Sequence, residues 1–372
     1  MTRALHIVHT EASLGWGGQE IRILTEAEGM AKRGHRVTLI APHEANIRRE
    51  GEARGITTVT LPLGRKNLRG LFALRGWLKA NPCDVVNTHS STDTWLTALA
   101  CATMSDAPPL VRTRHISAPV PDNLTTRWLY NKATTFIATT GEKLREQMMR
   151  EAHVDAARVM SVPTGIDLSR YRPADRSARR AELHLPPAAV IVGIVATLRS
   201  WKGHRYLLEA IAPLGDTRLV IVGDGPQRAA LEAQVDSLDL RGRVTFTGNL
   251  KDVAPWLQAF DLFALPSYAN EGVPQALMQA MACGLPVIST PVGSIAEIVE
   301  DGQTGLLVTP EDVVTLRAAI EKLMADAELR RALSAGARAR AEARFSDELM
   351  VSRMERMFIA AAAHRPLDGE SA

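Results

Sequence analysis

Two basic residues, Arg199 and Lys202, lie in the segment TLRSWKGH, between a predicted strand that ends near Ala196 and a predicted helix that starts near His204. A helix N-terminus carries a partial positive charge, so cations at this place do not stabilise the helix. They are well placed to neutralise the negative charge of a bound diphosphate. The alternative interpretation is that both are ordinary exposed charges of a surface loop.

An acid and an amide occur eight residues apart in the segment NEGVPQALMQAMACG, residues 270–284. Glu271 precedes a Gly-x-Pro turn, and a helix is predicted from Pro274 to Cys283, because proline lacks an N–H and suits a helix start. Gln279 lies about two helical turns further on, so Glu271 and Gln279 can both face one ligand. The alternative for Glu271 is that it only compensates the helix dipole.

Glycine-rich turns follow several predicted strands. Gly17 and Gly18, in SLGWGGQE, open the first helix and can bring backbone N–H groups toward a phosphate. The dinucleotide-binding fingerprint is incomplete, since Glu20 stands where a third glycine is needed. Later strands end at three further candidate ligand contacts: Gly223 in VGDGPQ, and Asn249 and Leu250 in FTGNL. Each turn also has a purely structural explanation as a tight turn or a cap.

Short apolar runs rich in Val and Ile alternate with amphipathic helical stretches along the chain. The predicted strands of the first half are ALHIVHT, RVTLIAP, TTVTLPL, DVVNTHS, PLVRTRH and TFIATT. Those of the second half are AVIVGIVATL, RLVIVGDG, RVTFTG, DLFALPS, LPVIST and TGLLVTP. This alternation is typical of doubly wound α/β domains with mostly parallel sheets, whose ligands collect at the carboxyl ends of the strands.

The pattern restarts after a connection placed between Thr164 and Pro186, which is rich in Pro, Gly and charge. It predicts an N-terminal Rossmann-like domain over residues 1–170 and a second one over 171–345. We expect residues 346–362 to form a helix that packs back on the N-terminal domain, and residues 364–372 to be disordered.

Composition places the chain among globular proteins: it has 372 residues, of which 46% are hydrophobic and 23% charged. No apolar run reaches the length of a membrane span, and the apolar start ALHIV is too short for a signal peptide, so a soluble cytoplasmic protein is expected. The three cysteines are odd in number and far apart in sequence, which argues against disulfides or a zinc site.

Basic charge is concentrated in the first half, where residues 1–170 hold 22 basic against 16 acidic side chains. Residues 171–372 hold 22 against 25. The clusters are Arg48, Arg49 and Arg54, and then Arg65, Lys66, Arg69, Arg75 and Lys79. They suit an anionic acceptor or an anionic membrane surface, with ordinary solvated charge as the alternative. Neither cluster is interleaved with aromatic residues, which argues against nucleic acid.

Six segments in this order and spacing resemble the family 4 retaining glycosyltransferases of GT-B fold: GGQE, KGHRYLLEA, VGDGP, FTGNL, PSYANEGVPQALMQAMACGLPVIST and EDGQTGLLV. The resemblance implies two Rossmann-like domains facing a central cleft. The second domain would bind a UDP- or GDP-sugar, and the first would bind a glycan or lipid-linked acceptor. It implies no metal and no other cofactor, and a place in lipopolysaccharide or surface polysaccharide synthesis.

The resemblance also implies roles for individual residues. Arg199 and Lys202 would stabilise the leaving diphosphate, and Glu271 would bind hydroxyls of the donor sugar. The donor pocket would be lined by the turn of residues 272–275, through the backbone N–H groups of Gly272, Val273 and Gln275. Pro274 belongs to the same turn but has no N–H group. Configuration would be retained by front-face attack without an enzyme nucleophile.

His115, which ends a predicted strand in VRTRHIS, would contact the donor sugar. His89 in NTHSS ends another strand, and Arg112 and Arg114 are candidates for meeting an acidic acceptor. Each strand-end histidine has the alternative of being an ordinary buried polar residue.

Three positions depart from the family pattern. Gln279 stands where the family usually has an acid that binds the ribose, Thr197 stands where it usually has the basic residue of the Lys202 loop, and Thr164 replaces an asparagine. Two other functions compete with glycosyl transfer: a nicotinamide-dependent Rossmann oxidoreductase and a non-catalytic two-lobed sugar-binding protein. The incomplete fingerprint at Glu20 argues against the first, and the lack of a predicted signal peptide argues against the second.

Overall fold

The structure is a computed structural model that describes residues 3–116, 118–269 and 271–367. The chain divides into two compact units. The N-terminal unit runs up to Gly165 and resumes at Asp347, and the C-terminal unit is Ile166–Ser346. The division therefore lies just before Ile166, whereas the sequence placed it after residue 170. Residues 368–372 of the predicted disordered tail lie outside the described residues.

The N-terminal unit is built on a parallel sheet in the order β3-β2-β1-β4-β5-β6-β7. The strands are β1 (His6–Thr10), β2 (Arg36–Ala41), β3 (Thr57–Thr60), β4 (Val85–Thr88), β5 (Leu110–Arg114), β6 (Phe136–Thr139) and β7 (Val159–Ser161). Its helices are α1 (Gly18–Lys32), α2 (Asn46–Ala53), α3 (Leu68–Ala80), α4 (Ser91–Cys101), α5 (Leu124–Trp128), α6 (Glu142–Glu151) and α15 (Asp347–Ala362). Strand β7 was not predicted from the sequence, because this edge strand is short and only partly buried.

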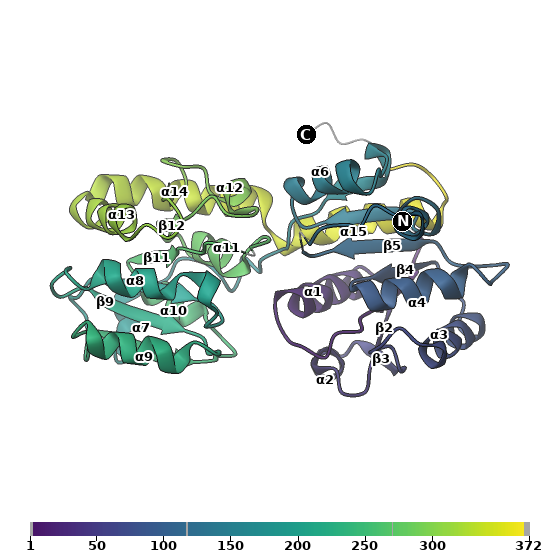
Figure 1. Ribbon diagram of the computed structural model, residues 1–372, viewed down its shortest axis with the longest axis horizontal. Coiled ribbons are helices and arrows are strands. Elements are labelled where there is room, and N and C mark those ends of the chain that lie inside the picture. The colour runs from purple at the N-terminus through teal and green to yellow at the C-terminus, as the bar shows by residue number, and fades with distance from the viewer. Residues whose placement is uncertain (1–2, 117, 270, 368–372) are drawn as a thin grey trace. The chain divides into compact units, whose positions relative to one another are not determined.

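Helices cover both faces of this sheet (Figure 1). Side chains alternate along each strand, so Ile7 packs with the core under α1 and α15, whereas Val8 packs with the core under α3 and α4. The last helix, α15, is held against α1, because Arg33 pairs with Glu348 and with Glu355. The final helix of the chain therefore belongs to the N-terminal unit.

The C-terminal unit has a second parallel sheet in the order β10-β9-β8-β11-β12-β13. The strands are β8 (Ile191–Val195), β9 (Arg218–Val222), β10 (Val244–Gly248), β11 (Leu262–Leu265), β12 (Val287–Ser289) and β13 (Leu306–Leu307). Its helices are α7 (Arg176–Glu182), α8 (His204–Ile211), α9 (Arg228–Ser237), α10 (Ala254–Ala259), α11 (Gln275–Ala282), α12 (Ile295–Ile298), α13 (Val313–Ala325) and α14 (Ala327–Arg344).

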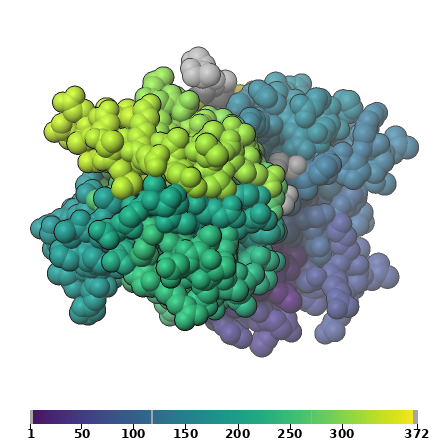
Figure 2. All heavy atoms as spheres, turned by 60° about the vertical axis from the view of Figure 1, so that its left-hand side comes forward, coloured from purple at the N-terminus to yellow at the C-terminus, as the bar shows by residue number. Residues whose placement is uncertain are grey.

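These helices pack pairwise around one continuous core, with α8 against α9 and α13, α11 against α14, and α7 against α10. Figure 2 shows the yellow-green atoms of the α13–α14 region forming an unbroken layer above the teal and green atoms of the rest of this unit. None of the helices among the described residues is both long and apolar enough to cross a membrane.

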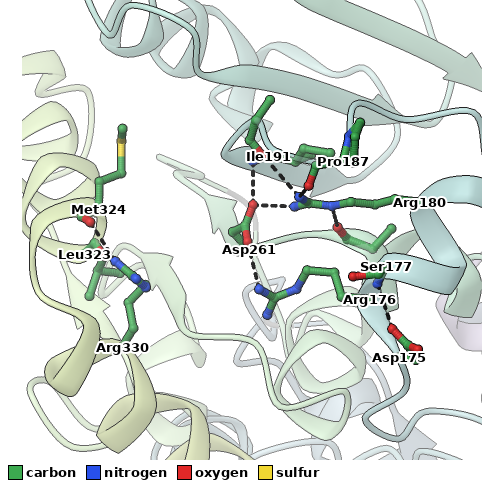
Figure 3. A network of polar contacts seen from close by, with 12 residues as sticks. Asp175, Arg176, Ser177, Arg180, Pro187, Ile191, Asp261, Leu323, Met324 and Arg330 are labelled. Atoms are coloured by element: carbon green, nitrogen blue, oxygen red, sulfur yellow. Dashed lines mark hydrogen bonds and ion pairs between the residues drawn. The ribbon is translucent and has the colours of Figure 1, made fainter.

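An ionic network closes the amino ends of β8 and β11 (Figure 3). Asp261 accepts hydrogen bonds from Arg176 at 2.8 Å, from Arg180 at 2.5 Å and from the Ile191 N–H at 2.7 Å. One partly buried carboxylate thus joins α7 to the amino ends of two strands.

Candidate functional site

The carboxyl ends of β8 and β11 bring Lys202 and Glu271 together. The strand order of the C-terminal sheet reverses between these neighbouring strands, so the loops that follow them leave in opposite directions and open a crevice. Lys202 lies in the loop after β8 and Glu271 in the loop after β11, and Lys202 Nζ is 2.7 Å from Glu271 Oε1. Two residues predicted separately from the sequence therefore form one ion pair.

Glu271 is held firmly, with only 5% of its surface exposed. The Ser267 hydroxyl donates to Oε1 at 2.5 Å, and the Ser267 carbonyl in turn accepts from the Thr290 hydroxyl at 2.5 Å. Gly293 packs against the backbone of Glu271 with a φ of 60°, and a Cβ there would lie 2.0 Å from the Glu271 carbonyl oxygen. Ser267, Thr290 and Gly293 were not predicted from the sequence. Ser267 and Thr290 are the last residues of the predicted strands DLFALPS and LPVIST, and Gly293 lies shortly after the second of these.

Arg199 takes a different position from Lys202. Its side chain is exposed, and its guanidinium lies over the Trp201 ring, 5.7 Å from the ring centre. Among the described residues no ion pair links Arg199 to Glu271. The predicted pair of cations therefore consists of one partly buried, paired lysine and one exposed arginine in the same loop.

The loops after β9 and β10 are joined by hydrogen bonds that involve residues predicted to contact the donor. The Gly223 N–H donates to the Gly248 carbonyl at 2.9 Å, and Asn249 Oδ1 accepts from the Asp224 N–H at 3.1 Å. Leu250 is partly exposed at 36%. Asn249 thus has a structural role in this loop pair.

The helix of the Gly-x-Pro segment is α11. It begins at Gln275 with Pro274 as the residue before it, so the proline caps the helix rather than forming its first residue. Gln275 and Gln279 lie one turn apart and are half-buried, as are Gly272 and Val273. The half-buried face of α11 thus presents two amides at the same edge of the sheet as Glu271.

In the N-terminal unit, the loop after β1 folds over a buried acid that the sequence analysis missed. Glu11 Oε1 accepts from the Ser13 N–H at 2.7 Å, and Oε2 accepts from Gln19 Nε2 at 2.5 Å. Burial, with the nearby charge of Asp93, raises the pKa of Glu11 to about 8. Gly17 precedes α1 and Gly18 begins it. The position of Glu11 directly after a predicted strand was a usable signal.

Three histidines form a hydrogen-bonded chain across the carboxyl ends of β1, β4 and β5. His9 Nδ1 is 3.0 Å from His89 Nε2, and His89 Nδ1 is 3.1 Å from His115 Nε2. Burial lowers the pKa of His9 to about 4 and the pKa values of His89 and His115 well below the ordinary range. At neutral pH these are therefore uncharged imidazoles. His115 and His89 were both named from the sequence, whereas His9 was not.

A cavity of about 440 Å³ lies beside this chain. Its polar and aromatic lining residues include Lys66, His89, Trp95, Arg112, Arg114, His115 and Tyr130. Arg112 lies over the Tyr130 ring, and Lys66 lies over the Trp95 ring. The cavity combines fixed cations, neutral imidazoles and aromatic faces at the ligand-binding edge of the sheet.

A larger cavity, of about 780 Å³, lies at the opposite edge of the C-terminal sheet. Its arginines are Arg176, Arg330, Arg331 and Arg338. Arg330 donates to the carbonyls of Leu323 and Met324 near the end of α13, as Figure 3 shows, and Arg338 donates to the Ala282 carbonyl at the end of α11. These guanidinium groups cap helix ends, which explains their presence without a ligand.

Comparison with known proteins identifies the chain. The family description "Glycosyl transferases group 1" matches residues 189–326, and "Glycosyltransferase Family 4" matches residues 16–170. The chain belongs to the family 4 glycosyltransferases. The D-inositol 3-phosphate glycosyltransferase of Mycobacterium sp. (strain KMS) is 32% identical over 275 residues, which is 67% of this chain; the match spans 61% of that relative's length.

Solved structures show the same GT-B fold of two parallel-sheet Rossmann-like domains as this family 4 chain. HepE from Anabaena, in complex with UDP, has a TM-score of 0.84 and 22% identity, covering 95% of this chain and 99% of that one. WaaG, a glycosyltransferase involved in lipopolysaccharide biosynthesis, has a TM-score of 0.70 and 20% identity, covering 95% and 99%. The predicted fold class is confirmed.

Proposed function

We propose that this family 4 protein transfers a sugar from a nucleotide-diphosphate sugar to a hydroxyl group of a glycan or lipid-linked acceptor, with retention of configuration. The observation that carries the proposal is the ion pair of Lys202 with buried Glu271 at the point where the C-terminal strand order reverses. A carboxylate at that place accepts hydrogen bonds from sugar hydroxyls, and an adjacent ammonium neutralises a phosphate.

In the proposed reaction the bond between the anomeric carbon and the diphosphate oxygen breaks, and its electron pair stays on the diphosphate. The acceptor oxygen bonds to the anomeric carbon from the same face, and its proton passes to the leaving phosphate oxygen. Lys202 and Arg199 stabilise the charge that develops on the diphosphate. Because these cations and backbone N–H groups at the turn of Gly272 and Val273 supply that stabilisation, the proposed reaction needs no metal.

The proposed donor is a UDP-sugar, with a GDP-sugar as the second choice. HepE, which shares the fold, has been solved with UDP and with UDP-glucose. Gln279 is proposed to meet the ribose, since it lies on the half-buried face of α11 in the segment that also holds Glu271. Its amide can accept through its carbonyl oxygen and donate through its NH₂.

The proposed acceptor belongs to surface glycan synthesis, including lipopolysaccharide. The lipopolysaccharide role of WaaG supports this choice, and the inositol phosphate named for the mycobacterial relative adds phosphorylated polyols to the acceptors to be tried.

A peripheral contact with an anionic membrane is also proposed, through helix α3. Leu68 and Phe72 are one helical turn apart and are 68% and 64% exposed, and Arg65 and Arg69 lie beside them in sequence. Exposed apolar side chains flanked by basic ones are typical of interfacial helices. Liposome co-sedimentation of wild type and Phe72→Ala, with and without anionic lipid and at two salt concentrations, tests this; equal sedimentation in all arms would refute it.

The main test is a donor screen by calorimetry and turnover over UDP-, GDP- and ADP-sugars, with and without EDTA, followed by NMR of the anomeric proton of the product. Binding of one class, EDTA-resistant turnover and a retained anomer are expected. Binding of NAD(P) with no nucleotide sugar bound would support the oxidoreductase alternative, and sugar binding without turnover would support the non-catalytic alternative. No observation in the structure favours either alternative.

A further inference from the structure

The 440 Å³ cavity of the N-terminal unit has an uneven charge. Three of its lining residues are cations, Lys66, Arg112 and Arg114, and none of its lining residues is an aspartate or glutamate. A charged group that is removed from water is costly unless a counter-charge accompanies it. The cavity wall therefore carries positive charge that a ligand can balance.

The two arginines project from the same face of β5, because residues two apart in a strand point to the same side. They are only 4% and 7% exposed. Arg112 donates to the Ser90 carbonyl and to the Thr94 hydroxyl, and Arg114 donates to the Tyr130 hydroxyl at 3.0 Å. All of these acceptors are neutral, and no carboxylate of the described residues lies within 4.0 Å of either guanidinium.

Unused donors remain in the wall of the cavity. The Nε groups of Arg112 and Arg114 are buried, and neither has a hydrogen-bond partner among the residues that the structure describes. A buried donor without a partner is unfavourable, so the neutral partners of the two guanidinium groups do not satisfy them fully. Helix α4 begins at Ser91 in the same wall, and its N-terminal dipole also favours an anion.

The acid nearest to this helix start is already satisfied. Asp93 accepts from the Thr10 hydroxyl, from the His89 and Ser90 N–H groups and from the Ser90 hydroxyl, and its residue is fully buried. Asp93 forms a capping box with Ser90 at the N-terminus of α4, and it does not line the cavity. Set against this one buried carboxylate, the three lining cations leave an excess of two positive charges.

Lys66 and Trp95 add an exposed cation and an aromatic face to the cavity lining. Lys66 Nζ is 3.2 Å from the Ser91 hydroxyl and 5.7 Å from the centre of the Trp95 ring. Trp95 in turn stacks on Trp128, with ring centres 6.2 Å apart. Both ring nitrogens of His89 are used in the histidine chain. The neutral imidazole of His115 has its Nδ1 outside that chain and can offer a donor or an acceptor to a hydroxyl group.

We propose that this cavity binds a hydroxyl-bearing acceptor through an anionic phosphate group on that acceptor. The phosphate lies between Lys66, Arg112 and Arg114 at the start of α4, and a hydroxyl group of the acceptor contacts His115. This inference rests on the proposed transferase function and names the chemical class of its acceptor. The phosphate can belong to a soluble sugar or polyol phosphate or to a phospholipid headgroup.

The test uses calorimetry on the full chain without donor. The probes are myo-inositol 1-phosphate, unphosphorylated myo-inositol and inorganic phosphate. Binding of the phosphorylated polyol at least about tenfold tighter than that of the neutral polyol is expected, with inorganic phosphate competing. Equal affinity for the phosphorylated and neutral polyols, or no binding of either, would overturn the proposal.

Variants locate the binding. Lys66 is exposed, so Lys66→Ala is expected to fold normally and to weaken phosphate-dependent binding about tenfold; Arg112→Lys is expected to weaken it as well by losing the planar guanidinium. Lys79→Ala on α3 is the matched control, because Lys79 is exposed and does not line the cavity. An unchanged affinity in Lys66→Ala and Arg112→Lys would place the binding elsewhere and refute the proposal.

Two further measurements identify the source of the phosphate and separate this inference from the proposed function. Phosphatidylcholine vesicles with and without phosphatidylinositol, in competition with soluble myo-inositol 1-phosphate, distinguish a headgroup source from a soluble one, and either source supports the phosphate site. UDP-glucose binding is measured on the same samples. Donor binding without phosphate binding would overturn this inference alone, whereas failure of every nucleotide sugar to bind would overturn the proposed function.

Discussion

Lys202 Nζ lies 2.7 Å from Glu271 Oε1, although the two residues are 69 positions apart in the chain. The carboxylate side chain is only 4% exposed and the lysine 20%. The cation proposed to neutralise the leaving diphosphate is thus also the counter-charge of the acid proposed to bind the sugar. Loss of either residue changes both charge balance and ligand contacts.

Lys202→Ala is expected to lower turnover at saturating donor about 100- to 1,000-fold, because a fixed cation is lost from the transition state. It is also expected to destabilise the fold by about 1–3 kcal/mol, since Glu271 remains buried without its counter-charge. Turnover and urea denaturation measure the two effects. Arg199→Ala is the comparison: it is expected to lower turnover while leaving stability within about 0.5 kcal/mol, because Arg199 is exposed. Full turnover in Lys202→Ala would remove this residue from the mechanism.

Gln279→Glu is expected to tighten UDP binding about fivefold, because a carboxylate accepts a ribose hydrogen bond more strongly than an amide. Gln279→Ala is expected to weaken it by a similar factor. Calorimetry with UDP gives both values. Gln303→Glu adds the same charge at an exposed turn and is expected to leave the affinity unchanged. If neither Gln279 variant alters UDP affinity, the residue does not contact the ribose.

Gly293→Ala is expected to disturb Glu271 directly. Its φ is +60°, and a Cβ would come within 2.0 Å of the Glu271 carbonyl oxygen. Gly302→Ala is the matched control, with a φ of +72° but no atom within 4 Å of the added Cβ. Both variants carry the strain of a positive φ, about 1 kcal/mol. Only Gly293→Ala is expected to reduce donor affinity and turnover, and equal loss in both would show that the close packing is unimportant.

The histidine chain predicts a single tautomeric pattern. A neutral imidazole donates from one nitrogen only, so His9, His89 and His115 must all carry the proton on Nδ1 or all on Nε2. Imidazole ¹⁵N shifts at pH 7, assigned with His115→Asn, are expected to show one common tautomer for the three. Exposed His43 serves as an unconstrained reference. Opposite tautomers within the chain would contradict the bonded arrangement.

Stability is expected to fall as the pH rises from about 6.5 to about 8. Burial raises the pKa of Glu26 from 4.5 to about 7 and that of Glu11 to about 8, so the folded state keeps protons that the unfolded state has released. Each proton held only by the folded state costs up to about 1.4 kcal/mol per pH unit. The buried histidines act with the opposite sign, and only at lower pH, between about 4 and 6.5 for His9.

Urea denaturation across that pH range measures this loss. Glu11→Gln keeps the side chain uncharged at every pH and is expected to flatten the decline, whereas exposed Glu328→Gln is expected to leave it unchanged. Stability that is constant or rises from pH 6.5 to 8 in the wild type would contradict burial of protonated carboxyl groups.

The sequence by itself determined the strand-and-helix alternation, the doubly wound fold class and the strand-end residues, because hydrophobic periodicity and turn residues are local properties. It identified Lys202, Glu271 and His115 one at a time. Which residues contact one another was decided only by the tertiary structure. Lys202 pairs with Glu271 because β8 lies beside β11. The chain of His9, His89 and His115 forms because β1, β4 and β5 are consecutive in the sheet. Strand order in a parallel sheet is set by crossover connections between distant segments, and burial of groups such as Glu11 follows from that order, so neither can be read from local pattern.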